Sequence, residues 1–313
     1  MASNDGRRNK FRMAVGAVLT LLVTALAFMA LGKVLGQVDA AAVSSSFQRT
    51  GYASMAVAAV LTAICYVALS GYDRVALRSI GYDLSWRRTI LGSTAAYALS
   101  HNLGFAPVTA SFARHRVYMR DGVGIADVAR IVVLTGASFW LGVILVMGIC
   151  LVAVPDLVGT SAWRLSRPLQ AAVGLLVIDI VVVYLLLISR GWRTMGRGRW
   201  SVPLPNLRDA IFQSGISLVE MAVASAVLWV LIPSAGIADY PLVLVAYVSA
   251  FVMVLITHAP GGAGVLETII ILMLRHLPAA DILSALILFR IVFHLVPLAV
   301  ALVILAMHRR KTA

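Results

Sequence analysis

The feature that most constrains this chain is a series of apolar runs, each about 20 residues or longer, that carry almost no charge. A helix of that length crosses the hydrocarbon core of a bilayer. Soluble helices of the same length show polar stripes at helical spacing, and these runs do not. With 61% hydrophobic and 12% charged residues, little sequence remains for a soluble domain. The sequence therefore predicts an all-α polytopic membrane protein with one transmembrane domain, residues 1–313.

Six of the runs are long enough to span a membrane as single helices, and two further apolar regions are interrupted. The predicted spans are residues 11–34, 52–72, 125–154, 169–189, 209–233 and 280–307. The interrupted regions are residues 89–124 and 241–278. The first span follows basic residues, as a secretory signal does, but it is long enough to cross and no convincing cleavage site follows it. We expect it to be an uncleaved helix.

The distribution of Lys and Arg predicts the orientation. If the N-terminus is cytoplasmic, most of the 26 Lys and Arg residues fall on the cytoplasmic side, including the loop 190–208 and the C-terminal tail. Cytoplasmic loops carry such an excess. We therefore expect cytoplasmic N- and C-termini in a bacterial inner membrane. The net charge of +13 then reflects topology and contact with anionic lipids, and we expect no nucleic-acid partner.

This orientation requires each interrupted region to enter and leave the membrane on one face. Residues 89–124 would form a re-entrant hairpin from the cytoplasmic face, and residues 241–278 one from the outer face. The two halves of the chain also match at a nearly constant offset. The matches are Ala106-Pro107 with Ala259-Pro260, Asp127 with Asp281, and Phe139-x-Leu141 with Phe293-x-Leu295. We expect an inverted repeat with halves at residues 11–154 and 165–308, an arrangement typical of transporters.

The second interrupted region contains the motif HAPGGAGVLE, which begins at residue 258. Proline cannot donate a backbone hydrogen bond and glycine permits tight turns, so the motif ends one helix and starts another. The helix starting near Gly264 would offer free N–H groups and the positive end of its dipole, which suit a phosphate or a carboxylate. The candidate binding residues of this region are His258, Pro260, Gly261, Gly262, Gly264 and Glu267.

The first interrupted region reads HNLGFAPVTASFARHRVY from residue 101, so the break at Pro107 leads into Arg114, Arg116 and Tyr118. Guanidinium groups bind phosphate oxygens in pairs, and a tyrosine hydroxyl suits the headgroup zone of a bilayer. These four residues are therefore candidates for headgroup binding. The alternative is that the two arginines only anchor the cytoplasmic end of a helix.

Ionisable residues inside the apolar runs are a further pointer, because each costs about 2.5–3.5 kcal/mol at a helix centre. Arg290 lies inside the last run, with His294 one turn later on the same face. We expect Glu267 to pair with Arg290, with Glu220 and Asp179 as alternatives. The pair is either a fixed structural contact or the lining of a polar headgroup path. His101 and His258 offer too few ligands for a metal, and we expect no metal and no cofactor.

Three segments also carry a resemblance to a known family. They are AYALSHNLGFAPVTASFARHRVYMRDGV, HAPGGAGVLE and LILFRIVFHLVPLAVALV. They resemble the lysylphosphatidylglycerol synthase transmembrane region family, a flippase-like membrane domain, over essentially the whole chain. The first break departs from the pattern, since it reads GFAPVTAS where glycine-richer loops are usual. The family pattern falls on Asn102, Gly104, Arg114, Arg116, Tyr118, Pro260, Gly261, Gly262, Gly264, Glu267, Arg290 and Pro297.

The resemblance implies movement of a lipid between leaflets. In bifunctional members this domain precedes a soluble aminoacyl-transferase domain, and because the sequence ends at Ala313 we expect no such chemistry and no enzyme activity. We expect a stand-alone lipid transporter for an anionic or phosphate-bearing lipid, in which Arg114 and Arg116 receive the headgroup and Glu267–Arg290 acts as a gate. The absence of a Walker motif predicts that this chain hydrolyses no ATP.

Two alternatives stay open. One is a membrane-embedded lipid-modifying enzyme that uses His101, His258, His294 and Glu267 as acid and base groups. The other is an accessory subunit of a separate lipid-modifying or glycosyl-transferring enzyme, docked through the basic loop 190–208.

Overall fold

The computed structural model describes residues 40–103, 106–153, 166–196, 202–257, 262 and 264–308. In these ranges the chain is helical apart from short turns and one pairing of two-residue strands, β1 (Thr194–Met195) with β2 (Val202–Pro203). The helices are α2 (Ala40–Ser79), α3 (Trp86–Leu103), α4 (Ala106–Tyr118), η1 (Met119–Asp121), α5 (Ile125–Ala153), α7 (Arg167–Ser189), α8 (Leu207–Leu231), η3 (Ile237–Asp239), α9 (Tyr240–Thr257), α10 (Val265–Met273), α11 (Ala279–Phe289), the π-helix η5 (Arg290–Leu295) and α12 (Val296–Met307).

Six helical segments of the described ranges are long and apolar enough to cross a membrane, which confirms the all-α polytopic fold. They are Ala40–Ser79, Ile125–Ala153, Arg167–Ser189, Leu207–Leu231, Ile237–Thr257 and Ala279–Met307. Five of them contain or closely match predicted spans, and the sixth predicted span, residues 11–34, lies outside the described residues.

The second interrupted region is less symmetric than the sequence predicts. Its first arm, Ile237–Thr257, has the length and hydropathy of a complete span, whereas α10 has nine residues and is too short to cross. The first interrupted region forms the helix pair α3 and α4, which pack against each other. Both regions thus have the predicted sequence of helix, break and helix. The re-entrant and inverted arrangements stay predictions.

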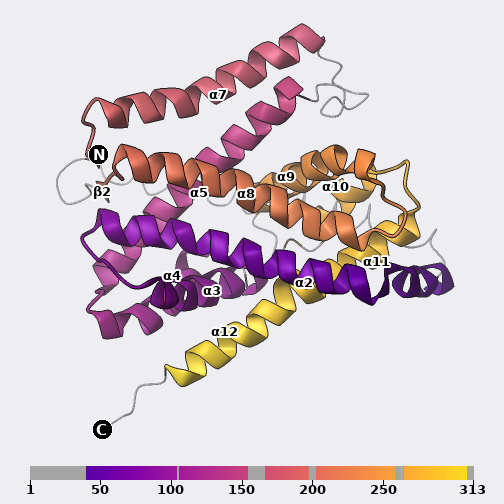
Figure 1. Ribbon diagram of the computed structural model, residues 1–313, viewed down its shortest axis with the longest axis horizontal. Coiled ribbons are helices and arrows are strands. Elements are labelled where there is room, and N and C mark those ends of the chain that lie inside the picture. Colours follow the sequence, from indigo (N-terminus) through magenta and orange to yellow (C-terminus); the bar gives the residue numbers. More distant parts are fainter. Residues whose placement is uncertain are drawn as a thin grey trace, which may run out of the picture.

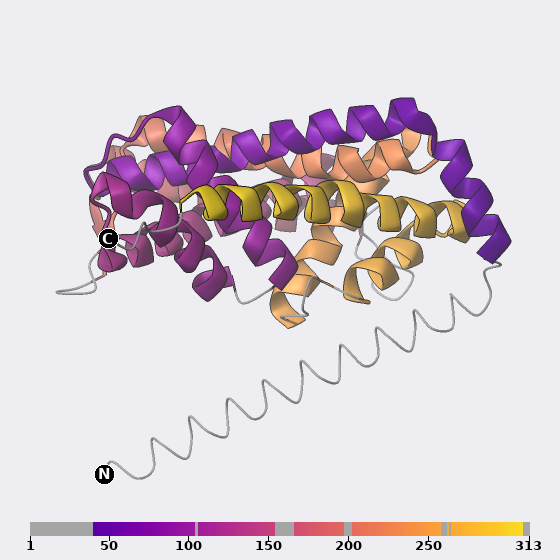
Figure 2. The ribbon, with the colours of Figure 1, turned by 90° about the horizontal axis from the view of Figure 1, so that it is seen from below.

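The long helices pack lengthwise into one bundle. In Figure 1, α2 and α8 lie along each other, α5 crosses beneath them, and α11 continues through η5 into α12. Figure 2 shows that α2 extends along most of the length of the bundle. Helix α2 bends at Gly51, whose φ of 66° falls in the left-handed region that glycine adopts without strain.

Two hydrophobic clusters form the core. The larger joins α2, α5, α8, α9, α10 and α11, and the smaller joins the last turns of α2 with α3, α4, the start of α5 and α12. Close approach at Gly92 makes the smaller cluster compact, because a Cβ added there would lie 2.1 Å from the ring of Tyr118. Glycine at this position therefore sets the spacing of α3 and α4.

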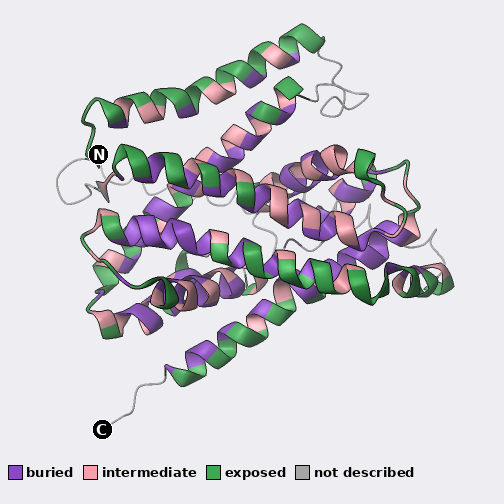
Figure 3. Cartoon of the chain, in the orientation of Figure 1, coloured by how far each residue is buried: buried purple, intermediate pink, exposed green. Residues whose placement is uncertain are grey.

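Helix α7 is the least enclosed of the six segments, since only 17% of its most apolar stretch of 18 residues is buried. Figure 3 shows its mostly exposed surface on the outside of the bundle. It packs on α5 where two glycines meet: a Cβ added to Gly174 would lie 2.8 Å from the carbonyl oxygen of Gly148. The small residues allow the two backbones to approach closely, as is typical of membrane helices.

Charged side chains gather where the ends of α2, α4 and α12 meet the starts of α3 and α8. Here Arg78 lies 3.9 Å from Asp209, and Arg88 contacts His308 at 3.0 Å. We call this the basic end and define it by Arg74, Arg78, Arg88, Arg116, Arg193 and Arg208. The opposite end joins the starts of α2 and α11 and the loop before α9, and we define it by Arg49, Asp239, His276 and Asp281.

Candidate functional site

The second break brings Glu267 and Arg290 together. Gly264, with φ of 79°, precedes α10, and its N–H donates to Glu267 Oε2 at 2.8 Å. The other carboxylate oxygen, Oε1, accepts from Arg290 Nε at 2.7 Å. Glu267 therefore caps its own helix with one oxygen and binds the last helical segment with the other. The predicted pairing is confirmed, and a charge inside an apolar run has its expected counterion.

The pair is only partly enclosed. The side chain of Glu267 is 11% exposed and that of Arg290 is 31% exposed. Arg290 also begins the π-helix η5, a form that is rare, occurs in single turns and is frequent at functional sites. A partly accessible guanidinium on an irregular helical turn can reach a phosphate oxygen without complete unfolding of its surroundings.

The two alternative carboxylates lie elsewhere. Glu220 of α8 is buried and accepts a hydrogen bond from the Tyr72 hydroxyl at 3.2 Å, and the same hydroxyl lies 2.8 Å from Ser217 Oγ. Asp179 is exposed near the middle of α7. Neither is paired with Arg290 by a contact between described residues, so Glu267 alone fills the predicted role.

Asn102 connects the first break to η5. Its amide nitrogen donates to the backbone oxygen of His294 at 3.0 Å and to that of Ala98 at 2.8 Å. A π-helical turn disturbs the regular ladder of backbone hydrogen bonds, and a side-chain donor can satisfy a carbonyl there. The structure thus brings together four of the predicted residues: Asn102, Glu267, Arg290 and His294.

A ring cluster surrounds His294. The ring of His101 lies 6.2 Å from that of His294 and is stacked on Phe293 at 6.3 Å. The Nδ1 atoms of both histidines are buried and have no hydrogen-bond partner among the described residues. In the described part of the chain, no group of three His, Cys, Asp or Glu side chains could hold a metal ion. The cluster is therefore mainly an aromatic contact between α3 and η5.

Arg114, in the helix after the first break, is buried in an ion pair, whereas the sequence predicted that it binds a headgroup. Arg114 is 2% exposed and forms two hydrogen bonds with Asp73: Nε to Oδ2 at 2.9 Å and Nη2 to Oδ1 at 2.7 Å. The Tyr118 hydroxyl donates to Asp73 Oδ2 at 2.9 Å, and the guanidinium lies 5.1 Å from the centre of the Tyr97 ring. This arrangement joins α2, α3 and α4 in the core. A headgroup-binding role for Arg114 and Tyr118 stays a prediction that this geometry does not favour.

The sequence interpretation missed Asp73. It ended the second predicted span at residue 72, whereas α2 continues to Ser79, so Asp73 lies inside the helix and is wholly buried. The available signal was a charge cluster, Asp73-Arg74, directly after an apolar run. Nothing in that cluster indicates which of the later arginines pairs with Asp73.

The remaining predicted residues are dispersed. Arg116 donates from Nε to the backbone oxygen of Leu305 at 3.1 Å and so ties α4 to α12. Pro107 is exposed in the first turn of α4. Gly262 is buried, with φ of 68°, and a Cβ there would lie 3.0 Å from Val254. Pro297 directly follows the π-helical turn η5 inside a continuous helical segment, where its missing N–H removes one backbone hydrogen bond. Gly104, His258, Pro260 and Gly261 lie outside the described residues.

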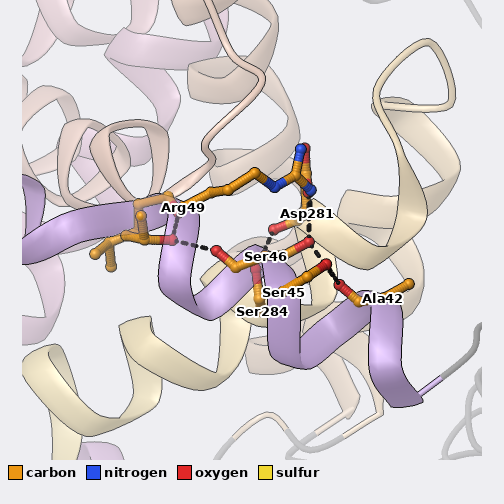
Figure 4. A network of polar contacts seen from close by, with 8 residues as sticks. Ala42, Ser45, Ser46, Arg49, Asp281 and Ser284 are labelled. Atoms are coloured by element: carbon orange, nitrogen blue, oxygen red, sulfur yellow. Dashed lines mark hydrogen bonds and ion pairs between the residues drawn. The ribbon is translucent and has the colours of Figure 1, made fainter.

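A further polar network joins α2 and α11 at the opposite end of the bundle, and the sequence analysis did not predict it. Figure 4 shows Arg49 and Ser46 of α2 directed at Asp281 of α11. The Ser46 hydroxyl donates to Asp281 Oδ1 at 2.6 Å, and Arg49 donates to the same oxygen. Asp281 is wholly buried, whereas the side chain of Arg49 is 56% exposed. The network fixes the start of the last helical segment to α2.

Comparison with known proteins gives consistent matches. Residues 13–301 match a family model described as the lysylphosphatidylglycerol synthase TM region. The uncharacterized protein slr0712 of Synechocystis sp. is 29% identical over 260 residues, which cover 83% of this chain and 80% of that protein. The inner membrane protein YbhN of Escherichia coli is 29% identical over 250 residues, which cover 78% of this chain and 76% of that protein.

Proposed function

Because the chain belongs to the lysylphosphatidylglycerol synthase TM region family, we propose that it moves an anionic or phosphate-bearing lipid between the leaflets of its membrane. Its span-length helices and its similarity to an inner membrane protein support a multi-pass location in the inner membrane. The proposal assigns no catalytic step to the chain. It places the basic end, where α12 ends, on the cytoplasmic side, where Lys and Arg are enriched.

The observation that carries this proposal is the Glu267–Arg290 pair. It couples the short helix α10 to the π-helical turn of the last span, and the side chain of Arg290 is partly exposed within an apolar segment. Complete enclosure would strengthen the attraction between the two charges, but it would also cost the desolvation of both and leave no access for a ligand. Partial exposure instead suits a guanidinium that exchanges its carboxylate for a phosphate oxygen.

In the proposed mechanism a phosphate group competes with Glu267 for Arg290 as the headgroup passes. Glu267 keeps its hydrogen bond from the Gly264 N–H during this exchange, so the start of α10 stays capped. The acyl chains remain in the bilayer, and the protein supplies polar contacts only to the headgroup. The separation of Glu267 from Arg290 would therefore open the path, and their return would close it.

The test is movement of a fluorescent phosphatidylglycerol across the bilayer of liposomes that contain the purified protein. We expect exchange between leaflets with the wild type and its loss in Arg290→Ala. The matched control is Arg130→Ala, which removes another helical arginine but one in an exposed pair with Asp127. Retention of exchange by folded Arg290→Ala protein at the wild-type rate would refute the role of the pair. No exchange by folded wild-type protein would count against transport of this lipid.

A further inference from the structure

A cavity of about 860 Å³ opens at the basic end, away from the Glu267–Arg290 pair. The end of α2, the start of α3, the segment that carries the β-strands and the start of α8 enclose it. Four arginines line it: Arg74, Arg78, Arg193 and Arg208. None of them was among the predicted site residues.

Arg74 is built into the wall of this cavity. Its side chain is 10% exposed, its Nη2 lies 2.8 Å from Asp83 Oδ1, and its guanidinium lies 5.7 Å from the centre of the Trp86 ring. Its Nε and Nη1 are buried without a hydrogen-bond partner among the described residues. Buried donors are nearly always satisfied, and a charged donor left unpaired is especially costly. This guanidinium is therefore held in place, and two of its nitrogen atoms have no acceptor in the described chain, a need that a phosphate oxygen could meet.

The charges around the cavity favour an anion. Arg193 and Arg208 are exposed, and neither forms an ion pair with a described residue. Two carboxylates oppose them: Asp83, near Arg74 and Arg78, and Asp209, which lies 3.9 Å from Arg78. Four guanidinium groups facing two carboxylates leave the cavity cationic.

The first turn of α8 also contributes positive electrostatic potential to the cavity. Asn206 caps this 25-residue helix by accepting from the Asp209 N–H at 2.9 Å, and both residues line the cavity. The positive end of the helix dipole therefore lies at the cavity wall, where it attracts negative charge.

An apolar slot of about 270 Å³ adjoins the cavity, and Leu204 lines both. Side chains of α5, α7 and α8 form most of the slot, among them Val133, Ala137, Leu141 and Tyr184. A cationic cavity next to an apolar slot matches a molecule with an anionic head and a hydrocarbon chain. A free phosphate ion would use only the first part.

We propose that the arginine cavity binds the phosphate of an anionic phospholipid and that the adjoining slot takes part of one acyl chain. The inference deepens the proposed function and rests on it for its role, because it names where the headgroup is received before it reaches Arg290. Arg74 supplies the enclosed contact, and Arg208 and Arg193 supply exposed ones. Binding itself is measurable without transport.

The test is equilibrium binding of fluorescent phosphatidylglycerol to the detergent-solubilised full chain, with inorganic phosphate as a competitor. Arg74→Gln and Arg208→Gln should each weaken lipid affinity about tenfold, the loss of one charge-assisted contact. Arg208 is exposed, so its variant tests the cavity even where Arg74→Gln fails to fold. Arg130→Gln, at the same end of the molecule, should bind like the wild type.

A second pair of measurements separates the lipid from a free anion. Ala137→Phe fills the apolar slot and should weaken phosphatidylglycerol binding while the affinity for inorganic phosphate stays unchanged. An equal loss of affinity for both ligands, an unchanged affinity for both, or phosphate binding without any lipid binding would overturn the lipid assignment. Wild-type lipid affinity in folded Arg74→Gln and Arg208→Gln would overturn the site.

Arg290→Ala distinguishes this inference from the proposed function. We expect it to move no lipid, whereas adding Arg208→Gln to it should still weaken phosphatidylglycerol binding about tenfold, as in the wild-type background. A wild-type protein that binds the lipid in an arginine-dependent way but moves none would disprove the transport role and leave the site standing. Transport that survives while the two cavity variants bind normally would disprove the site alone.

Discussion

Two carboxylate–guanidinium pairs accompany the two interrupted regions, and they differ in how closely the protein surrounds them. Asp73–Arg114 is almost completely buried, uses both carboxylate oxygens and is completed by the Tyr118 hydroxyl. Glu267–Arg290 uses one carboxylate oxygen, and the side chain of Arg290 is 31% exposed. The first pair holds three helices in a fixed arrangement, whereas the second joins a short helix to an irregular turn.

The difference shows that an arginine near a helix break is not by itself a ligand site. Arg114 follows a break and resembles a phosphate-binding residue in sequence, yet its hydrogen-bonding capacity is directed at Asp73. Arg290 lies deeper in an apolar run, yet more of its surface is accessible. The two arginines therefore differ in how far the protein buries their side chains and in which carboxylate they contact.

The largest expected effect is the loss of the enclosed pair. Asp73→Asn leaves Arg114 buried without its counterion, and we expect the free energy of unfolding in detergent to fall by about 3–5 kcal/mol. Chemical or thermal unfolding of the purified protein measures it. Asp127→Asn is the control, because Asp127 lies in an exposed pair and should matter little. An Asp73→Asn protein as stable as the wild type would remove the contrast between the two pairs.

An intermediate effect is expected at the partly open pair. Glu267→Gln weakens the contact with Arg290 and the cap on the Gly264 N–H, and we expect a loss of about 1.5–3 kcal/mol in stability. Lipid movement in liposomes should fall much further than stability. Part of the movement should return in the double variant Glu267→Arg, Arg290→Glu, which restores opposite charges. A Glu267→Gln protein that moves lipid normally would make this pair structural, like the first.

The smallest effect is expected from Tyr118→Phe. The change removes the hydroxyl that donates to Asp73 Oδ2, at 2.9 Å, while the ring keeps its contact with Gly92. We expect a loss of about 1–2 kcal/mol in the free energy of unfolding. Lipid movement at a temperature well below unfolding should be unchanged. Loss of transport in stable Tyr118→Phe protein would instead assign the first break a direct part in the lipid path.

Hydropathy was sufficient to predict most of the spans, because uncharged runs such as those of α5, α7 and α8 leave no other fold open to them. The Glu267–Arg290 pair was predictable because a lone arginine in an apolar run requires a counterion and few carboxylates lie within the apolar regions. Asp73–Arg114 was not, since the two residues are 41 positions apart and the whole of α3 lies between them. The π-helical form of residues 290–295 was not predictable either, because this segment reads as ordinary helix.

The arginine cavity illustrates the same limit. Arg74 is far in the sequence from Arg193 and Arg208, which belong to the loop 190–208, and each reads only as a positive charge near a helix end. Their common direction depends on how α2 and α8 pack, and the burial of Arg74 Nε and Nη1 depends on the same packing. Only three-dimensional proximity turns a topology signal into a candidate site.

Because α7 lies at the periphery of the bundle, we expect its orientation to depend on the thickness of the membrane. The helix has 23 residues, about 35 Å in length, and its neighbours in the described chain are mainly α5 and α8. The helix is therefore longer than an average bilayer core of about 30 Å and crosses it with a tilt, which its packing on α5 limits. Because Tyr184 of α7 lines the apolar slot, we expect a thinner or thicker membrane to change the width of that slot.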